Sequence, residues 1–223
     1  MNMLQKAAIV LVSVVFTTLP IRAEMMTFED AGKPGDVPVG FTQATTGKGV
    51  AANWKLQEVP GAPSGKLVVG QLSAGGDMRF PVLVNDKFNA ADVELSVKFK
   101  AIAGKDDQAA GLVWRYQDAN NYYVVRANAL EDNVVLYIVS NGRRIDLPVK
   151  GKGRTYGAKA PIKKAEWNTL AVSAKGTLFQ VSLNGAVLYE VEDRAIAKPG
   201  KVGLWTKADS IMQFDDFSIE LAK

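Results

Sequence analysis

The chain has 223 residues, of which 48% are hydrophobic and 22% are charged, and it contains neither cysteine nor histidine. This composition is typical of a globular domain and excludes disulfide bonds, cysteine nucleophiles and all triads or metal sites that use histidine. The formal charge of +4 is too small for a nucleic-acid-binding protein, so no nucleic-acid partner is expected.

The N-terminal segment has the features of a secretory signal. Lys6 precedes an apolar run over residues 7–16, and the small residue Ala23 follows. We therefore expect residues 1–23 to be a cleaved signal peptide and residues 24–223 to be one exported domain, periplasmic or extracellular. The apolar run is too short to span a membrane, and the mature chain contains no longer one, so we expect no transmembrane segment.

Strand patterns dominate the rest of the chain. The clearest covers residues 92–100, where apolar and polar side chains alternate strictly, as in a half-buried strand. Further strands are predicted, in chain order, at residues 54–59, 66–72, 111–117, 122–128, 134–139, 167–174, 179–183, 187–191, 202–206 and 217–221.

Turns and breaks between these strands indicate how they pair. Asn141-Gly142 and Asn184-Gly185 each lie between two strand patterns and favour tight hairpin turns, so the strands should be antiparallel. Residues 32–49 and 151–160 are interpreted as long loops. Because no helical periodicity is present over a helix-length segment, the pattern predicts an all-β fold, a two-sheet antiparallel jelly-roll sandwich in a single domain.

One predicted hairpin, residues 111–117 and 122–128, is the most informative segment. A four-residue loop pairs Gln117 with Tyr122, and every second residue then shares a face. One face is apolar, includes Trp114 and is predicted to face the core. The other is predicted to face solvent, and we interpret its polar side chains as a ligand-binding surface: Arg115, Gln117, Tyr122, Arg126 and Asn128.

Two further aromatic residues have undecided positions at this stage. Tyr137 joins the polar face if the connection after residue 128 has four residues, and it turns to the core if that connection has five. Trp205 lies in a late strand, either at the rim of the ligand surface or in the core.

Residues 111–118 (GLVWRYQD), 121–123 (NYY), 200–206 (GKVGLWT) and 214–217 (FDDF) resemble the concanavalin A-like lectin/glucanase superfamily. Within it, the chain is most similar to laminin G-like domains and bacterial 3-keto-disaccharide hydrolase-type domains over roughly residues 92–221. The resemblance implies a jelly roll in which one curved sheet offers a concave surface to ligands, and the polar hairpin face would belong to that surface.

Catalytic residues are not evident. Retaining glucanases of this superfamily need paired carboxyl groups about 5 Å apart on one strand, and the corresponding Glu-x-Asp-x-Glu pattern is absent here. Glu131 and Asp132, just after the hairpin, are the carboxylates of interest. A structural calcium ion is a further candidate, with Asp30, Asp215 and Asp216 as ligands, because exported jelly rolls often join strand ends through hard oxygen ligands.

Three functions are compatible with these observations. The first is an exported lectin-like module whose partner is a carbohydrate or glycan. The second is a sugar-active enzyme, a hydrolase or lyase acting on modified glycosides, and the third is a laminin G-like protein-interaction domain. A loop with six basic and no acidic residues, 150–164, is interpreted either as a flexible loop or as a contact for an acidic polysaccharide.

Overall fold

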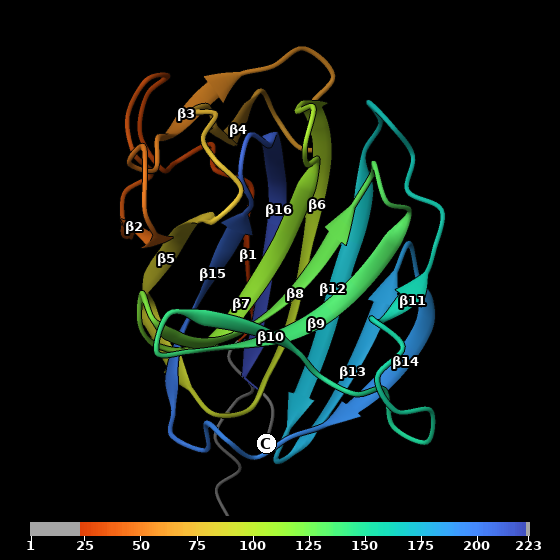
Figure 1. The fold of residues 1–223 in the computed structure, drawn as a ribbon. Coiled ribbons are helices and arrows are strands. Elements are labelled where there is room, and N and C mark those ends of the chain that lie inside the picture. Colours follow the sequence, from red (N-terminus) through yellow and green to blue (C-terminus); the bar gives the residue numbers. More distant parts are fainter. Residues whose placement is uncertain (1–22, 222–223) are drawn as a thin grey trace, which may run out of the picture.

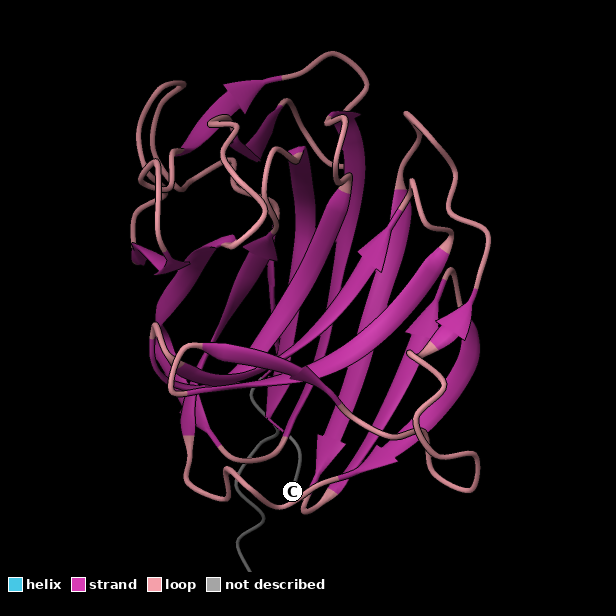
Figure 2. Cartoon of the chain, viewed as in Figure 1, coloured by secondary structure: helices cyan, strands magenta, loops and turns pink. Residues whose placement is uncertain are grey.

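The computed structural model describes residues 23–221 as sixteen β-strands without a helix (Figures 1 and 2). The predicted signal peptide lies outside the described residues, apart from Ala23. The strands are β1 (Ala23–Met26), β2 (Phe41–Gly47), β3 (Trp54–Glu58), β4 (Leu67–Gln71), β5 (Arg79–Ala90), β6 (Val93–Ala103), β7 (Ala109–Asp118), β8 (Asn121–Asn128), β9 (Asn133–Ser140), β10 (Arg143–Asp146), β11 (Ala158–Lys159), β12 (Asn168–Lys175), β13 (Leu178–Leu183), β14 (Ala186–Glu192), β15 (Gly200–Thr206) and β16 (Ile211–Leu221).

These strands form two antiparallel sheets. Sheet A has the order β14-β13-β12-β6-β16-β4-β3, with β1 also paired to β16, and sheet B has the order β10-β9-β8-β7-β15-β5-β2, with β11 paired to β9. The two sheets lie face to face (Figure 1). The predicted all-β sandwich is therefore confirmed. No helix in the described part of the chain is long and apolar enough to cross a membrane.

The main core lies between the two sheets. In β6 every second side chain is buried, as the alternating sequence predicts, and Leu95, Val97 and Phe99 belong to this core. Trp54 packs against Phe214 with ring centroids 5.5 Å apart, and these rings come from two different strands of sheet A. Burial of such rings is the dominant source of stability in a chain without disulfides.

Both Asn-Gly turns are confirmed as hairpin turns. Asn141 and Gly142 connect β9 to β10 with φ values of 49° and 75°, and Asn184 and Gly185 connect β13 to β14 with values of 49° and 82°. Positive φ at both central residues is the geometry that these residue types adopt readily.

The loop predictions were partly wrong. β2 lies inside the predicted loop 32–49, and β11 lies inside the predicted loop 151–160. β5 was not predicted either. The polar strand β2 (FTQATTG) lacks alternating apolar residues, so the sequence pattern did not predict it. It is an edge strand of sheet B and pairs with one strand, β5.

Candidate functional site

The outer face of sheet B is covered rather than solvated. It carries a second apolar cluster that includes Phe80, Val113, Tyr122, Tyr137 and Trp205, all at most 2% exposed. The predicted solvent exposure of this face was wrong, since Arg126 and Asn128 are also buried. The short strand β10 crosses in front of neighbouring strands in Figure 1 and supplies part of the cover. Trp205 is therefore a buried residue of this outer cluster.

The β7–β8 hairpin has the predicted register at its turn, where Asp118 pairs with Asn121, but not beyond it. A register shift between Trp114 and Asp118 places Gly111, not Val113, opposite Arg126. A shift of two residues leaves the side chains of the regularly paired part of the hairpin, residues 109–114 and 123–128, on their predicted faces. Trp114 therefore faces the core, as predicted, and stacks on Tyr123 with ring centroids 5.5 Å apart.

A bulge between Trp114 and Asp118 removes Arg115 from the predicted ligand surface. Arg115 has a φ of 48°, and its guanidinium lies 5.4 Å from the ring of the core residue Phe179. It donates to the carbonyl oxygens of Ala91 and Ile196 at 2.8 Å. The bulge redirects this side chain between the sheets, where it joins connecting segments. Gln117 is exposed, and its Nε2 donates to the Pro199 carbonyl oxygen at 2.9 Å. Gln117 lies at the opposite end of the hairpin from Asn128.

Arg126 is the centre of a network on the outer face of sheet B. Its Nη1 donates to Glu131 Oε2 at 3.0 Å, and its Nη2 donates to the Tyr137 hydroxyl at 2.9 Å. Asn133 Nδ2 donates to the same Glu131 oxygen at 2.9 Å, and the Tyr137 hydroxyl donates to that of Tyr156 at 2.8 Å. Burial raises the pKa of Glu131, but Arg126 and Asn133 outweigh burial and hold it below its ordinary value. Glu131 is therefore an anion at neutral pH.

The position of Tyr137 settles the alternative left open by the sequence. Asn128 pairs with Asn133, so the connection between β8 and β9 has four residues. Tyr137 consequently lies on the same face as Arg126, opposite Val124. Tyr122 lies on this face too, but its hydroxyl is bonded to Thr46 and to the Trp205 indole inside the apolar cluster. Tyr122 is therefore a buried residue of the apolar cluster and does not contact solvent.

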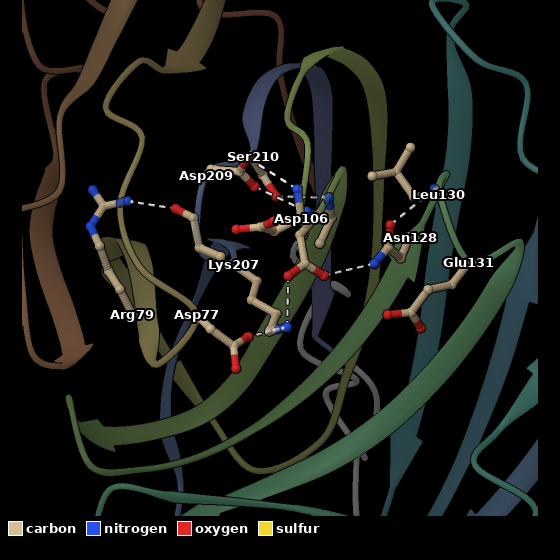
Figure 3. A network of polar contacts seen from close by, with 12 residues as sticks. Asp77, Arg79, Asp106, Asn128, Leu130, Glu131, Lys207, Asp209 and Ser210 are labelled. Carbon is tan, nitrogen blue, oxygen red and sulfur yellow. Dashed lines mark hydrogen bonds and ion pairs between the residues drawn. The ribbon is translucent and has the colours of Figure 1, made fainter.

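Lys207 forms a second network beside the first (Figure 3). Its Nζ lies 2.6 Å from a carboxylate oxygen of Asp77 and 2.6 Å from one of Asp107. The other oxygen of Asp107 accepts from Asn128 Nδ2 at 2.8 Å. Electrostatic coupling connects the networks, because Lys207 contributes to the low pKa of Glu131.

Two residues fix the loops that carry this charged cluster. Asp209 accepts bonds from the backbone N–H groups of Lys105, Asp106 and Asp107, and thereby holds the β6–β7 loop against the β15–β16 loop. Arg79 is fully buried and donates only to carbonyl and hydroxyl oxygens, including the Ser73 and Ala208 carbonyls. Segments far apart in the sequence therefore meet at one end of sheet B.

Arg144 of β10 lies over aromatic rings of the outer cluster. Its guanidinium carbon is 4.4 Å from the centroid of Tyr137, 4.9 Å from that of Phe80 and 5.8 Å from that of Trp205. The turn before β10 is fixed by two bonds to the neighbouring hairpin, from Asn141 N to the Asn121 side chain and from Gly142 N to the Asn120 carbonyl. This strand therefore holds Arg144 against the rings.

We define the site as the charged cluster formed by the two networks and their aromatic neighbours: Asp77, Asp107, Arg126, Asn128, Glu131, Asn133, Tyr137, Arg144, Tyr156 and Lys207. Arg126, Asn128 and Tyr137 were predicted as ligand-binding residues, and Glu131 was a carboxylate of interest. The other residues carry no local sequence signal, because they come from separate loops, from a strand end and from an unpredicted edge strand. Tyr156 lies in the basic segment 150–164, in which the prediction rested on the lysine and arginine residues.

The basic loop is partly neutralised by neighbours. Arg154 donates to the carboxylate of Asp146 at 2.8 Å, and Lys159 donates to the Glu131 carbonyl at 2.9 Å. Lys150 lies 3.8 Å from Glu190. The loop thus contributes fewer free cations than its sequence indicates.

Two of the three predicted calcium ligands are engaged in other contacts. Asp215 accepts from Ser64 N at 3.0 Å, and Asp216 lies 2.7 Å from Lys98 Nζ. Across the described residues, 23–221, no group of three or more acidic side chains is arranged to hold a metal. β1 pairs with β16, so the first and last described strands are neighbours in sheet A. Calcium binding at Asp30, Asp215 and Asp216 stays a prediction.

A hollow of about 350 Å³ lies elsewhere, on the outer face of sheet A. Its lining consists mainly of small hydroxyl side chains, with Glu94 and Glu220 at one side. This hollow lacks a buried charge and an aromatic ring among its lining residues, so the charged cluster of sheet B has the richer binding chemistry.

The fold is a two-sheet antiparallel jelly roll with a charged cluster on the outer face of sheet B. The sequence model of the 3-keto-alpha-glucoside-1,2-lyase-like domain matches residues 40–220, and the chain therefore belongs to this family. This agrees with the resemblance to 3-keto-disaccharide hydrolase-type domains. No curated protein matches the chain.

Solved structures with a similar fold have low sequence identity. The carbohydrate binding module CBM66 from Bacillus subtilis is 19% identical, with a TM-score of 0.62 over 81% of this chain and 95% of that chain. The cellulose induced protein Cip1 is 11% identical, with a TM-score of 0.59 over 88% and 96%. A putative glycosyl hydrolase from Parabacteroides distasonis is 16% identical, with a TM-score of 0.51 over 85% and 91%. These likenesses establish the fold.

Proposed function

We propose that the protein binds carbohydrate at the charged cluster of sheet B. One observation carries the proposal. Tyr156 exposes 46% of its surface beside the ion pair that the buried Arg126 forms with the partly exposed Glu131. An exposed ring next to fixed charged groups is the combination that sugar recognition requires.

The chemistry of each part suits a polyhydroxylated ligand. The apolar face of a sugar ring packs on an aromatic ring, while its hydroxyl groups donate to carboxylates and accept from cations. Glu131 uses Oε2 for both of its hydrogen bonds, and among the described residues Oε1 has no such bond. The side chain of Glu131 is 38% exposed, so Oε1 is an acceptor for a ligand hydroxyl.

The family and the structural neighbours support the same class of ligand. CBM66 is named as a carbohydrate binding module, and the family is named for a glucoside. The identities are too low to transfer a particular sugar or a particular subsite. We therefore leave the sugar to experiment.

A glycan array followed by calorimetry tests the proposal on residues 24–223. We expect saturable binding by the wild-type protein and a loss of at least tenfold in Tyr156→Ala and Glu131→Ala. Val187→Ala is the control, because Val187 is 59% exposed and belongs to β14, an edge strand of sheet A, not to the charged cluster. Binding that survives both site variants, or no binding to any glycan, would refute the proposal.

A second candidate function is lyase or hydrolase activity on a 3-keto-glycoside, favoured by the family assignment. A 3-keto group acidifies the C2 proton, so a carboxylate base such as Glu131 would remove that proton while the C1–O bond breaks and the leaving oxygen is protonated. The test is product formation from 3-keto-glucosides. Glu131→Gln is expected to abolish turnover, but it also removes the counter-ion of Arg126, so binding must be measured in parallel.

Export and calcium binding are separate proposals. Fractionation of cells and mass spectrometry of the purified protein would establish whether residues 1–23 are removed and where the product is found. Thermal melting with calcium and with a chelator would test the ion, and an unchanged melting temperature would exclude a structural calcium site.

A further inference from the structure

Arg144 differs from the other cations of the charged cluster. Arg126 is paired with Glu131, and Lys207 is paired with Asp77 and Asp107. Among the described residues Arg144 has no ion pair within 4 Å, although it interacts electrostatically with Asp77, and its guanidinium packs against aromatic rings. Arg144 is therefore the one cation of the defined cluster without a direct acidic partner.

Two guanidinium nitrogens of the cluster also lack hydrogen-bond acceptors. They are Nη1 of Arg144 and Nε of Arg126, and both are buried. The Arg126 side chain is 1% exposed. Both guanidinium groups lie within 6 Å of the Tyr137 ring, so the two unsatisfied donors flank one aromatic residue. A buried donor without an acceptor is costly, which indicates that an acceptor belongs at this place.

We infer that the carbohydrate recognised here is acidic, and that a carboxylate on a uronic-acid unit is received by Arg144 beside Tyr137. This inference rests on the proposed function and specifies its ligand class. A carboxylate brings a negative charge directly to Arg144 and accepts two parallel N–H bonds from one guanidinium. A neutral hydroxyl supplies no charge and only one acceptor oxygen.

The surroundings strengthen the interaction. The rings of Phe80, Tyr137 and Trp205 exclude water from one side of Arg144, and a charge pair is stronger where water is excluded. Arg144 is only partly buried, so an anion approaches it without disruption of β10. The Glu131 carboxylate is neutralised by Arg126 and repels the ligand less than a free carboxylate would.

The experiment compares matched ligands by calorimetry. Oligosaccharides that contain galacturonate, glucuronate or mannuronate are measured beside their methyl esters and their neutral counterparts. We expect at least one acidic form to bind about tenfold or more tightly than its own ester, with a preference that falls as salt is raised. Equal affinity of acid and ester forms throughout would overturn the inference and leave the proposed function intact.

Variants locate the carboxylate. Arg144→Gln is expected to reduce affinity for the acidic form about tenfold and to shrink the ratio between acid and ester. Arg143→Gln is the matched control, because Arg143 is the exposed preceding residue of the same strand. An unchanged ratio in Arg144→Gln, or preference for sulfated glycans over uronates, would overturn the inference. Absence of binding to every glycan would overturn the proposed function as well.

The comparison does not depend on the folding of a variant. Melting temperatures of Arg143→Gln and Arg144→Gln report whether both fold. If Arg144→Gln fails to fold, the acid-to-ester ratio of the wild-type protein still decides whether the ligand is acidic. In that case Arg144→Lys is measured in place of Arg144→Gln. If the acid-to-ester affinity ratio of Arg144→Lys equals that of the wild-type protein, the carboxylate does not accept two N–H bonds from the Arg144 guanidinium.

Discussion

Asp107 and Lys207 lie 100 residues apart in the chain and form an ion pair, with 2.6 Å between Oδ2 and Nζ. Asp107 belongs to the β6–β7 loop and Lys207 follows β15, so the pair joins two loops at the end of sheet B. The Asp107 side chain is almost fully buried. The pair therefore stabilises both the fold and the charged cluster.

Replacement of Lys207 is expected to destabilise the protein. Lys207→Met leaves the buried Asp107 carboxylate without its cation, and we expect a loss of about 3 kcal/mol in the free energy of unfolding. The matched control is Lys201→Met, whose pair with Asp86 is exposed on both sides. The free energy of unfolding should fall by less than about 1 kcal/mol in Lys201→Met. Urea denaturation measures this free energy in both variants, and equal decreases would contradict the expected difference between the buried and the exposed ion pair.

Asp209 makes the same region sensitive to acid. Burial raises its pKa, but the three backbone N–H donors of residues 105–107 outweigh burial and hold the pKa below the ordinary value of 3.8. A lowered pKa gives stability that is present above 3.8 and is lost as pH falls through the folded-state pKa. Asp209→Asn removes this contribution.

Denaturation of the wild-type protein and of Asp209→Asn between pH 2 and pH 7 tests this contribution. The wild type should be more stable above pH 4, and the gap between the two proteins should shrink as pH falls below that value. Other carboxylates titrate in both proteins and cancel in the difference. A gap that is independent of pH would show that Asp209 acts without its charge.

Arg115 is expected to matter for stability and not for ligand affinity. Arg115→Met removes the donors to the Ala91, Ile196 and Gly176 carbonyls, and we expect a loss of about 3 kcal/mol in the free energy of unfolding. Calorimetry with a glycan that the wild type binds should give an unchanged affinity in the folded variant. Lost affinity with unchanged stability would return Arg115 to the ligand surface that the sequence predicted.

Gly157 controls the position of Tyr156. It has a φ of 69°, and a Cβ there would lie 2.0 Å from the Val134 carbonyl oxygen, so Gly157→Ala must displace this segment from β9. We expect ligand affinity to fall about fivefold to tenfold as the ring leaves the cluster. Gly151→Ala is the matched control, because Gly151 has a φ of 74° but an added Cβ has no neighbour within 4 Å. If Gly157→Ala and Gly151→Ala reduce affinity equally, the close approach of Gly157 to the Val134 carbonyl in β9 has no role in ligand binding.

Local patterns were sufficient to predict the sandwich and part of the site. Alternation in β6 and the two Asn-Gly turns identified antiparallel strands, and a face is robust to a register error of two residues. Arg126 and Asn128 were consequently placed together on one face of the hairpin, whereas the face of Tyr137 depended on the length of the β8–β9 connection, which only the structure gives. Glu131 was noticed because it follows the hairpin directly.

The remaining features depend on contacts that no local pattern encodes. The β7 bulge redirects Arg115, although the sequence around it continues the strand pattern. Lys207 and Asp77 meet only because β5 and β15 are neighbours in sheet B. The apolar cover of the outer face includes Arg144, a polar residue on an edge strand, so hydrophobic periodicity gave no indication of its role.

The place of β16 has a consequence for how the chain folds. β16 lies between β6 and β4 in sheet A and also pairs with β1, so the centre of this sheet joins strands from early, middle and late parts of the described chain. These pairings have a large sequence separation, and their loop-closure entropy must be paid before the sheet gains its contacts. The domain therefore has a topology that favours slow folding.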